Sequence, residues 1–254
     1  MSGLTIFFVI YAYVAILFFI AGFLYRIWKY ASTPAPLKIP QTPAPVAAPG
    51  VARRMVAEVT LFKSLFNGNK IIWLFGYVFH LGLLVALLKH YRFAFDYSPS
   101  WLVYLTTFEL YAGLIMLGGL MMLFLLRLVV DRTNFITVMT DYILLVLLIG
   151  IAGTGLLLKH FYRTDVTSVK EFVLGLVSFN PQEMPADAFF IIHITLVFLL
   201  LIYFPFSKLM HSGGIFFSPT RNQVDNARDK RLVTPWAAAP ESIQIASNMT
   251  QEEG

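Results

Sequence analysis

The sequence contains no cysteine among its 254 residues. Disulfides, cysteine-ligated iron–sulfur clusters and covalent attachment of c-type haem through Cys-x-x-Cys-His are therefore excluded within this chain. A redox centre held by the chain must use histidine, methionine or carboxylate ligands, or it must lie on a partner protein.

Charge is also scarce in this sequence. Only 13% of the residues are charged and 58% are hydrophobic, whereas a soluble domain has about a quarter charged residues. The mean hydropathy is +0.72. This composition predicts a polytopic membrane protein, and we attribute the net charge of +5 to lysines and arginines that set its topology.

Five apolar runs are each long enough to cross a bilayer, since about 20 residues of helix span a hydrocarbon core of about 30 Å. They cover residues 4–25, 71–89, 101–126, 135–158 and 188–209. In lipid only helices and closed barrels satisfy the backbone, and these long runs are typical of helices. The sequence therefore predicts an all-α integral membrane protein with five transmembrane helices.

The first run differs from a signal peptide. No lysine or arginine precedes it, and it is longer than the usual apolar region of a signal peptide. We therefore expect it to be a retained helix that begins outside the membrane.

The distribution of lysine and arginine predicts the orientation. With the N-terminus outside and five spans, the inner segments hold fourteen of these residues and the outer segments hold five. An excess of lysine and arginine is typical of the cytoplasmic loops of membrane proteins. We expect an external N-terminus and a cytoplasmic C-terminus.

The segments between and after the spans have distinct compositions. Residues 31–50 contain six prolines, so we expect an extended strip without helix, either a plain linker or an ordered arm against a cytoplasmic partner. Residues 51–70 have helical apolar spacing and predict one amphipathic helix at the interface. From residue 218 onward the polar tail is expected to have little structure without a partner.

The five histidines are the candidate functional side chains of the chain. Two lie on the second span and two on the fifth; the residues are His80, His90, His160, His193 and His211. Ionisable side chains within a membrane are costly and indicate function, and histidines on facing helices can ligate haem iron from both sides. Because the two spans run in opposite directions, equal depth pairs His90 with His193 near the outer face and His80 with His211 near the inner face. These four are the predicted haem- and metal-binding residues, for two b haems, and no catalytic residue is predicted.

The axial spacing of the two pairs does not match. Ten residues of helix advance about 15 Å and eighteen advance about 27 Å. We expect a kink at Pro205 and a helix end beside Ser212 to absorb part of the difference. From the spans and the composition of the segments between them, we expect a first transmembrane helix (1–30), a Pro/Ala-rich and amphipathic cytoplasmic segment (31–70), a four-helix haem-binding core (71–215) and a cytoplasmic tail (216–254).

Three other ionisable residues have open roles. His160 is either an interfacial residue or a hydrogen-bond partner for a quinone beside the outer haem. Glu109 and Asp141 are intramembrane carboxylates, which either handle protons or accept hydrogen bonds from a ligand histidine or a tyrosine. Glycines in the second, third and fourth spans fit close helix packing or the approach of a flat macrocycle equally well.

The histidine spacings of ten and eighteen, on the second and fifth of five spans, resemble the gamma-subunit family of respiratory nitrate reductase over roughly residues 70–215. The resemblance implies a dihaem cytochrome b with the same two ligand pairs. The segments 33–45, 205–211 and 217–222 further resemble the DsrM family, the membrane cytochrome b subunits of the DsrMKJOP complexes of dissimilatory sulfur metabolism.

The second resemblance extends over most of the chain and implies its partners. These are a cytoplasmic DsrK-like iron–sulfur subunit, together with DsrJ, DsrO and DsrP. It implies electron transfer between quinone or menaquinone and that iron–sulfur subunit, in sulfite reduction or sulfur oxidation, at the inner (cytoplasmic) membrane.

Two other functions compete with this one. A proton-coupled transporter would use the histidines, Glu109 and Asp141 as a relay, and a haem-free membrane anchor would leave the histidines without a cofactor. Many transporters contain internal repeats, but the halves of this sequence show no repeat, and an odd number of spans argues against a simple duplication.

Overall fold

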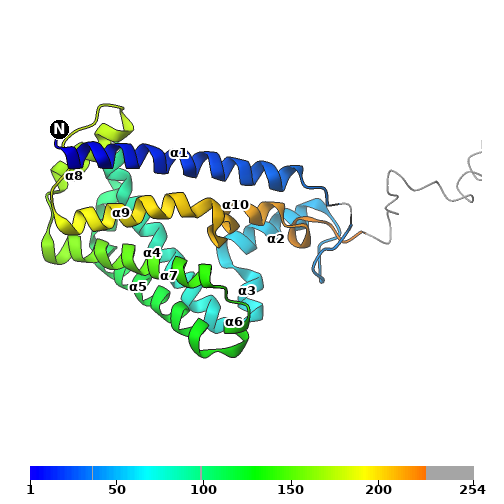
Figure 1. The fold of residues 1–254 in the computed structure, drawn as a ribbon. Coiled ribbons are helices and arrows are strands. Elements are labelled where there is room, and N and C mark those ends of the chain that lie inside the picture. Colours follow the sequence, from blue (N-terminus) through cyan, green and yellow to red (C-terminus); the bar gives the residue numbers. More distant parts are fainter. Residues whose placement is uncertain (36, 98, 227–254) are drawn as a thin grey trace, which may run out of the picture.

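The computed structural model describes residues 1–35, 37–97 and 99–226. These residues form helices and connecting segments without any strand (Figure 1). Five helical stretches are long and apolar enough to cross a membrane. They correspond to α1 Gly3–Ser32, α4 Lys70–Ala94, α5 Trp101–Val129, α7 Met139–Leu157 and α9 Ala188–Tyr203, and the last two stretches also include the turns that follow α7 and α9, to Tyr162 and Phe206. The prediction of an all-α protein with five such helices is confirmed.

Polar side chains mark where several helices begin. The Asn69 amide oxygen accepts two backbone N–H groups of the first turn of α4, at 3.0 Å each. The Asp187 carboxylate accepts the Phe190 N–H at the start of α9, at 2.9 Å. Such caps satisfy otherwise unpaired donors and stabilise a helix by about 1 kcal/mol each.

The start of α1 is tied to the loop before α9 through Glu183. This carboxylate accepts hydrogen bonds from the Ser2 N–H at 3.0 Å and from the Thr5 hydroxyl at 2.7 Å. The hydrogen bonds from Ser2 and then Thr5 lower the pKa of Glu183 to about 2. The carboxylate is therefore ionised at neutral pH, and the tie is present there.

The core has two separate parts. One joins α1, α8 (Val166–Val177) and α9 around the fully buried Phe172. The other joins α4, α5 and α7 around Leu120, which is 1% exposed. Many large apolar side chains on the outward faces of the long helices are exposed, as expected for surfaces in contact with lipid.

Close packing of α4 on α5 depends on two glycines. A Cβ added to Gly82 would lie 2.6 Å from the Ala112 carbonyl oxygen, and one added to Gly119 would lie 3.0 Å from the Phe75 carbonyl oxygen. Small residues allow such close backbone approach in membranes. Close helix packing is therefore the role of these two glycines, whereas a Cβ at Gly118 would meet nothing within 4 Å.

The two histidine-bearing helices are held by different neighbours. Helix α4 packs on α5 and α8, and α9 packs on α1 and α7 (Figure 1). Among the described residues, α4 and α9 are not closely packed on one another. The two helices are thus positioned to face each other across a separation.

The segment before α4 differs from the expectation in two places. Residues 51–70 form two helices, α2 Ala48–Leu61 and α3 Lys63–Gly68, because the chain adopts a left-handed conformation at Phe62 with φ 50°. The prediction of a single helix is wrong. The prediction of no helix in 31–50 is wrong at both ends, where α1 continues to Ser32 and α2 begins at Ala48, and it is confirmed for the described residues between them.

The proline-rich strip runs along the C-terminal segment of the same chain. The Gln41 N–H donates to the Thr220 carbonyl oxygen at 2.8 Å, and the Asp225 N–H donates to the Pro45 carbonyl oxygen at 2.8 Å. A short helix, α11 Pro219–Asn222, lies in this part of the tail. The expectation of little structure is thus wrong for 219–222, and residues 227–254 lie outside the described residues.

The fifth span ends earlier than predicted. Helix α9 ends at Tyr203 instead of residue 209, since Pro205 lacks the N–H that would continue the helix. Two 3₁₀ turns follow, Phe204–Phe206 and Lys208–Met210, and then the short α10, His211–Gly214.

Candidate functional site

The structure brings the four span histidines together as two pairs. The ring centroids of His80 and His211 lie 6.1 Å apart, with an interplanar angle of 86°. Those of His90 and His193 lie 6.5 Å apart, with an angle of 17°. Each pair combines one residue of α4 with one residue of α9 or the segment that follows it.

The break after α9 explains how pairs with unequal sequence spacing can both form. Ser207 is extended, with φ −110° and ψ 174°. Residues 208–211 therefore do not prolong the axis of α9, while α4 continues unbroken past both of its histidines. The difference in axial advance between ten and eighteen helical residues is taken up at this break.

Hydrogen bonds hold three of the imidazoles through their Nδ1 atoms. The acceptors are backbone carbonyl oxygens, of Gly76 for His80 at 2.6 Å, Ala86 for His90 at 2.6 Å and Lys208 for His211 at 2.7 Å. A carbonyl can only accept, so Nδ1 carries the proton and Nε2 keeps its lone pair. This is the usual arrangement of a metal-ligating histidine.

The fourth imidazole is held by a hydroxyl group. His193 Nδ1 lies 2.9 Å from the Thr154 Oγ1, which itself lies 2.7 Å from the Gly150 carbonyl oxygen. If Thr154 donates to the carbonyl, it accepts from Nδ1, and Nε2 of His193 again keeps its lone pair. A Cβ added to Gly155 would lie 3.2 Å from the His193 ring, so this glycine leaves room for the ring.

The geometry of both pairs suits a metal held between two imidazoles. Two rings that bind one metal from opposite sides, with metal–nitrogen bonds of about 2.0 Å, have centroids roughly 6 Å apart. The described residues contain no group of three or more His, Cys, Asp or Glu side chains that could hold a metal ion. Two-histidine sets fit haem, because the porphyrin supplies the other four ligands.

Phe62 packs against the His80–His211 pair from a strained position. Its ring contacts His80 edge-on at 4.9 Å between centroids, and its φ of 50° is unfavourable for a residue with a Cβ. Two hydrogen bonds hold the turn around it: the Trp73 Nε1–H donates to the Leu61 carbonyl oxygen at 2.8 Å, and the Ser64 N–H donates to the Glu58 carboxylate at 3.1 Å. Strain retained in this way is common at functional sites.

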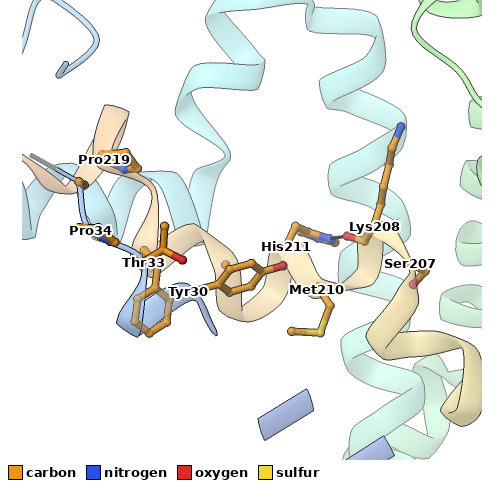
Figure 2. Close-up of a pocket in the computed structure, with 11 residues that line it drawn as sticks. Tyr30, Thr33, Pro34, Ser207, Lys208, Met210, His211 and Pro219 are labelled. Atoms are coloured by element: carbon orange, nitrogen blue, oxygen red, sulfur yellow. Dashed lines mark hydrogen bonds between the residues drawn. The ribbon is translucent and has the colours of Figure 1, made fainter. Parts of the chain in front are cut away.

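Two cavities adjoin His211. One, of about 440 Å³, lies between the end of α1 and the Ser207–His211 segment, and Figure 2 shows Tyr30, Met210 and His211 on its walls. The other, of about 380 Å³, is lined by Phe62, His211 and Arg221 among others. His211 is thus bordered by open volume on two sides.

The predicted carboxylates are both ion-paired with lysine. Asp141 is 4% exposed and lies 2.5 Å from the Lys208 Nζ. Glu109 lies 2.8 Å from the Lys159 Nζ and 3.2 Å from that of Lys89, the residue before His90. Asp141 also lies 3.9 Å from an Nη atom of the Arg127 guanidinium. The side-chain partners of both carboxylates are thus cations instead of the expected imidazole or tyrosine, and a proton-handling role stays a prediction.

His160 lies apart from both pairs, in the π-helical turn Leu158–Tyr162. Its Nε2 is buried and has no hydrogen-bond partner among the described residues. The choice between an interfacial residue and a quinone partner stays open.

Sequence reasoning missed three residues that hold the histidines: Thr154, Phe62 and Lys208. A hydroxyl in an apolar span was the available signal for Thr154. The sequence carries no signal for Phe62, because its role depends on a break between two helices. Lys208 stands three residues before His211, but the sequence argument uses this lysine only in the count of charges that predicts the orientation.

Similarity to known proteins covers the region of the chain that contains the two histidine pairs. The model of the nitrate reductase gamma subunit family matches residues 58–224, a range that includes all four histidines. The Hdr-like menaquinol oxidoreductase cytochrome b-like subunit of Archaeoglobus fulgidus is 33% identical over 280 aligned positions, covering 92% of this chain and 84% of the relative. The protein of the same description from Archaeoglobus profundus is 30% identical, covering 90% and 82%.

Proposed function

Because the chain belongs to the nitrate reductase gamma subunit family, we propose that it is a dihaem cytochrome b that exchanges electrons between a quinone and a cytoplasmic partner. The observation that carries the proposal is the presence of two histidine pairs at 6.1 and 6.5 Å between centroids. His90 and His193 would hold the outer haem, and His80 and His211 the inner haem. When bound, the haems supply one-electron transfer across the thickness of the membrane.

The residues of this chain would fix the chemical character of both centres. Imidazole on both sides leaves no open coordination position, so the pairs favour electron transfer over oxygen chemistry. The Nδ1 hydrogen bonds orient the rings and raise the basicity of the ligands. The apolar helices around them provide a low-dielectric surrounding that helps set the redox potential.

Menaquinol is the proposed electron donor or acceptor. Two relatives are named as cytochrome b-like subunits of an Hdr-like menaquinol oxidoreductase, and the resemblance to the DsrM family supports the same class of substrate. We place quinone exchange near His90 and His193, at the outer side of the membrane.

The proposed electron partner is a DsrK-like iron–sulfur subunit on the cytoplasmic side. It would dock on α2, α3, the proline-rich strip and α11. Helix α2 lies at the same end of the bundle as α10, the short helix that begins with His211 (Figure 1). DsrJ, DsrO and DsrP are the further proposed partners, in sulfite reduction or sulfur oxidation. The excess of lysine and arginine on this side supports a cytoplasmic location and an inner-membrane protein with an external N-terminus.

The test is the haem content of the purified full-length protein. We expect a reduced-minus-oxidised spectrum of low-spin b haem with two haems per chain, and reduction by a menaquinol analogue. A folded protein that contains no haem would contradict the proposal and favour an anchor or a transporter.

A further inference from the structure

The structure assigns a positioning role to Lys208: we propose that it holds the His211 ring in its ligating orientation by fixing its own peptide to the buried Asp141. The inference rests on the proposed function in one respect, that His211 is an axial ligand. It concerns a residue that is not itself a proposed ligand.

His211 needs such support because it does not stand on a long helix. Helix α9 ends at Tyr203, and the chain reaches His211 through two three-residue 3₁₀ turns. Short 3₁₀ turns have poor hydrogen-bond geometry and little stability of their own. In contrast, the carbonyl oxygens that hold His80 and His90 belong to the continuous helix α4.

The anchor for this segment is Asp141, in the first turn of α7. Its carboxylate is 4% exposed, lies 2.5 Å from the Lys208 Nζ, and also accepts the Val138 N–H at 3.2 Å. The carboxylate is therefore fixed to the start of a long helix. The Lys208 side chain is 58% exposed, and fully exposed ion pairs contribute little. Its partner carboxylate is buried, however, and a charge-assisted hydrogen bond to a buried carboxylate is among the stronger contacts of a protein.

The same residue orients the histidine through its backbone. The Lys208 carbonyl oxygen accepts the His211 Nδ1–H at 2.7 Å. Figure 2 shows this hydrogen bond, with the Lys208 side chain extending away from the imidazole ring. One residue thus links a fixed point on α7 to the rotation of the His211 ring.

The experiment compares four variants of the full-length protein: Lys208→Met, Asp141→Asn, the double variant of these two, and Lys208→Arg. Loss of the anchor should change the electron paramagnetic resonance signal and the midpoint potential of the inner haem, which His211 would ligate, and leave the outer haem unchanged. Lys208→Arg should restore both properties. The double variant removes both charges of the Lys208–Asp141 pair, and we expect it to resemble the single variants instead of adding their effects. Lys89→Met removes a lysine that pairs with the other carboxylate, Glu109. It is the matched control and should leave the inner haem signal unchanged.

The inference is overturned if Lys208→Met and Asp141→Asn leave both signals as in the unmodified protein. It is also overturned if both haems change together, if the outer haem alone changes, or if Lys208→Arg fails to rescue. An unmodified protein without haem would instead contradict the proposed function, so the two failures are distinguishable.

Discussion

The imidazole planes of His80 and His211 are crossed at 86°, whereas those of His90 and His193 are inclined by only 17°. The two pairs have nearly the same separation, 6.1 and 6.5 Å between centroids, and differ mainly in relative rotation. Near-parallel imidazole planes separate the energies of the iron dxz and dyz orbitals more than crossed planes do. The two proposed haems should therefore be spectroscopically distinct although both have histidine on each side.

We predict two low-spin ferric signals in electron paramagnetic resonance of the oxidised protein. The inner haem should give the more anisotropic signal, with the larger maximum g value, because its ligand planes are crossed. Redox titration of each signal would separate the centres. Two identical rhombic signals would contradict this prediction.

Thr154→Val should weaken the outer haem selectively. Valine has a similar shape but cannot accept the Nδ1–H of His193, which lies 2.9 Å from the Thr154 hydroxyl. Loss of such a partner typically lowers metal affinity by about 10- to 100-fold. Haem retention during dilution measures the effect, and Thr154→Ser is the control that should bind as before. Equal retention in the valine variant would show that this hydroxyl does not support the ligand.

Phe62→Gly and Phe62→Ala should separate backbone strain from ring contact. Both remove the ring that lies 4.9 Å from His80, so both should alter the inner haem signal. Glycine adopts a φ of 50° without the cost of about 1–2 kcal/mol that a Cβ imposes. The glycine variant should therefore be the more stable of the two in thermal unfolding in detergent. An unchanged inner signal in both variants would exclude a role for the ring.

Gly82→Ala should destabilise the bundle, because the added Cβ would lie 2.6 Å from the Ala112 carbonyl oxygen. Overpacking of this kind costs about 1–3 kcal/mol. Gly118→Ala is the matched control: nothing lies within 4 Å of its Cβ, and alanine in a helix is favourable by up to about 1 kcal/mol over glycine. Unfolding midpoints of the two variants test the difference. A stable Gly82→Ala protein would show that α4 and α5 can separate without cost.

Much of the architecture follows from the sequence. Apolar length predicted five long helices, because a bilayer sets the number of residues that each must contain. The opposite directions of the second and fifth spans placed His80 beside His211 and His90 beside His193, and the structure has these as neighbours. Their role as haem ligands stays a prediction.

The features that the sequence did not predict depend on tertiary contacts. Pro205 suggested a kink, but the end of α9 at Tyr203 and the extended Ser207 are supported by other parts of the chain, such as the Arg26 Nε–H that donates to the Pro205 carbonyl oxygen at 3.0 Å. The split of 51–70 into two helices likewise lies at Phe62, whose ring packs against His80 on another helix. Periodicity within one segment carries no record of such partners.

The ligand assignment is tested most directly by replacing each of the four histidines with alanine and measuring which haem is lost. We predict that His80→Ala and His211→Ala remove the same haem, that His90→Ala and His193→Ala remove the other, and that each variant retains one haem per chain. Survival of both haems after loss of His80, or depletion of the same centre by His80→Ala and His90→Ala, would contradict the proposed pairs.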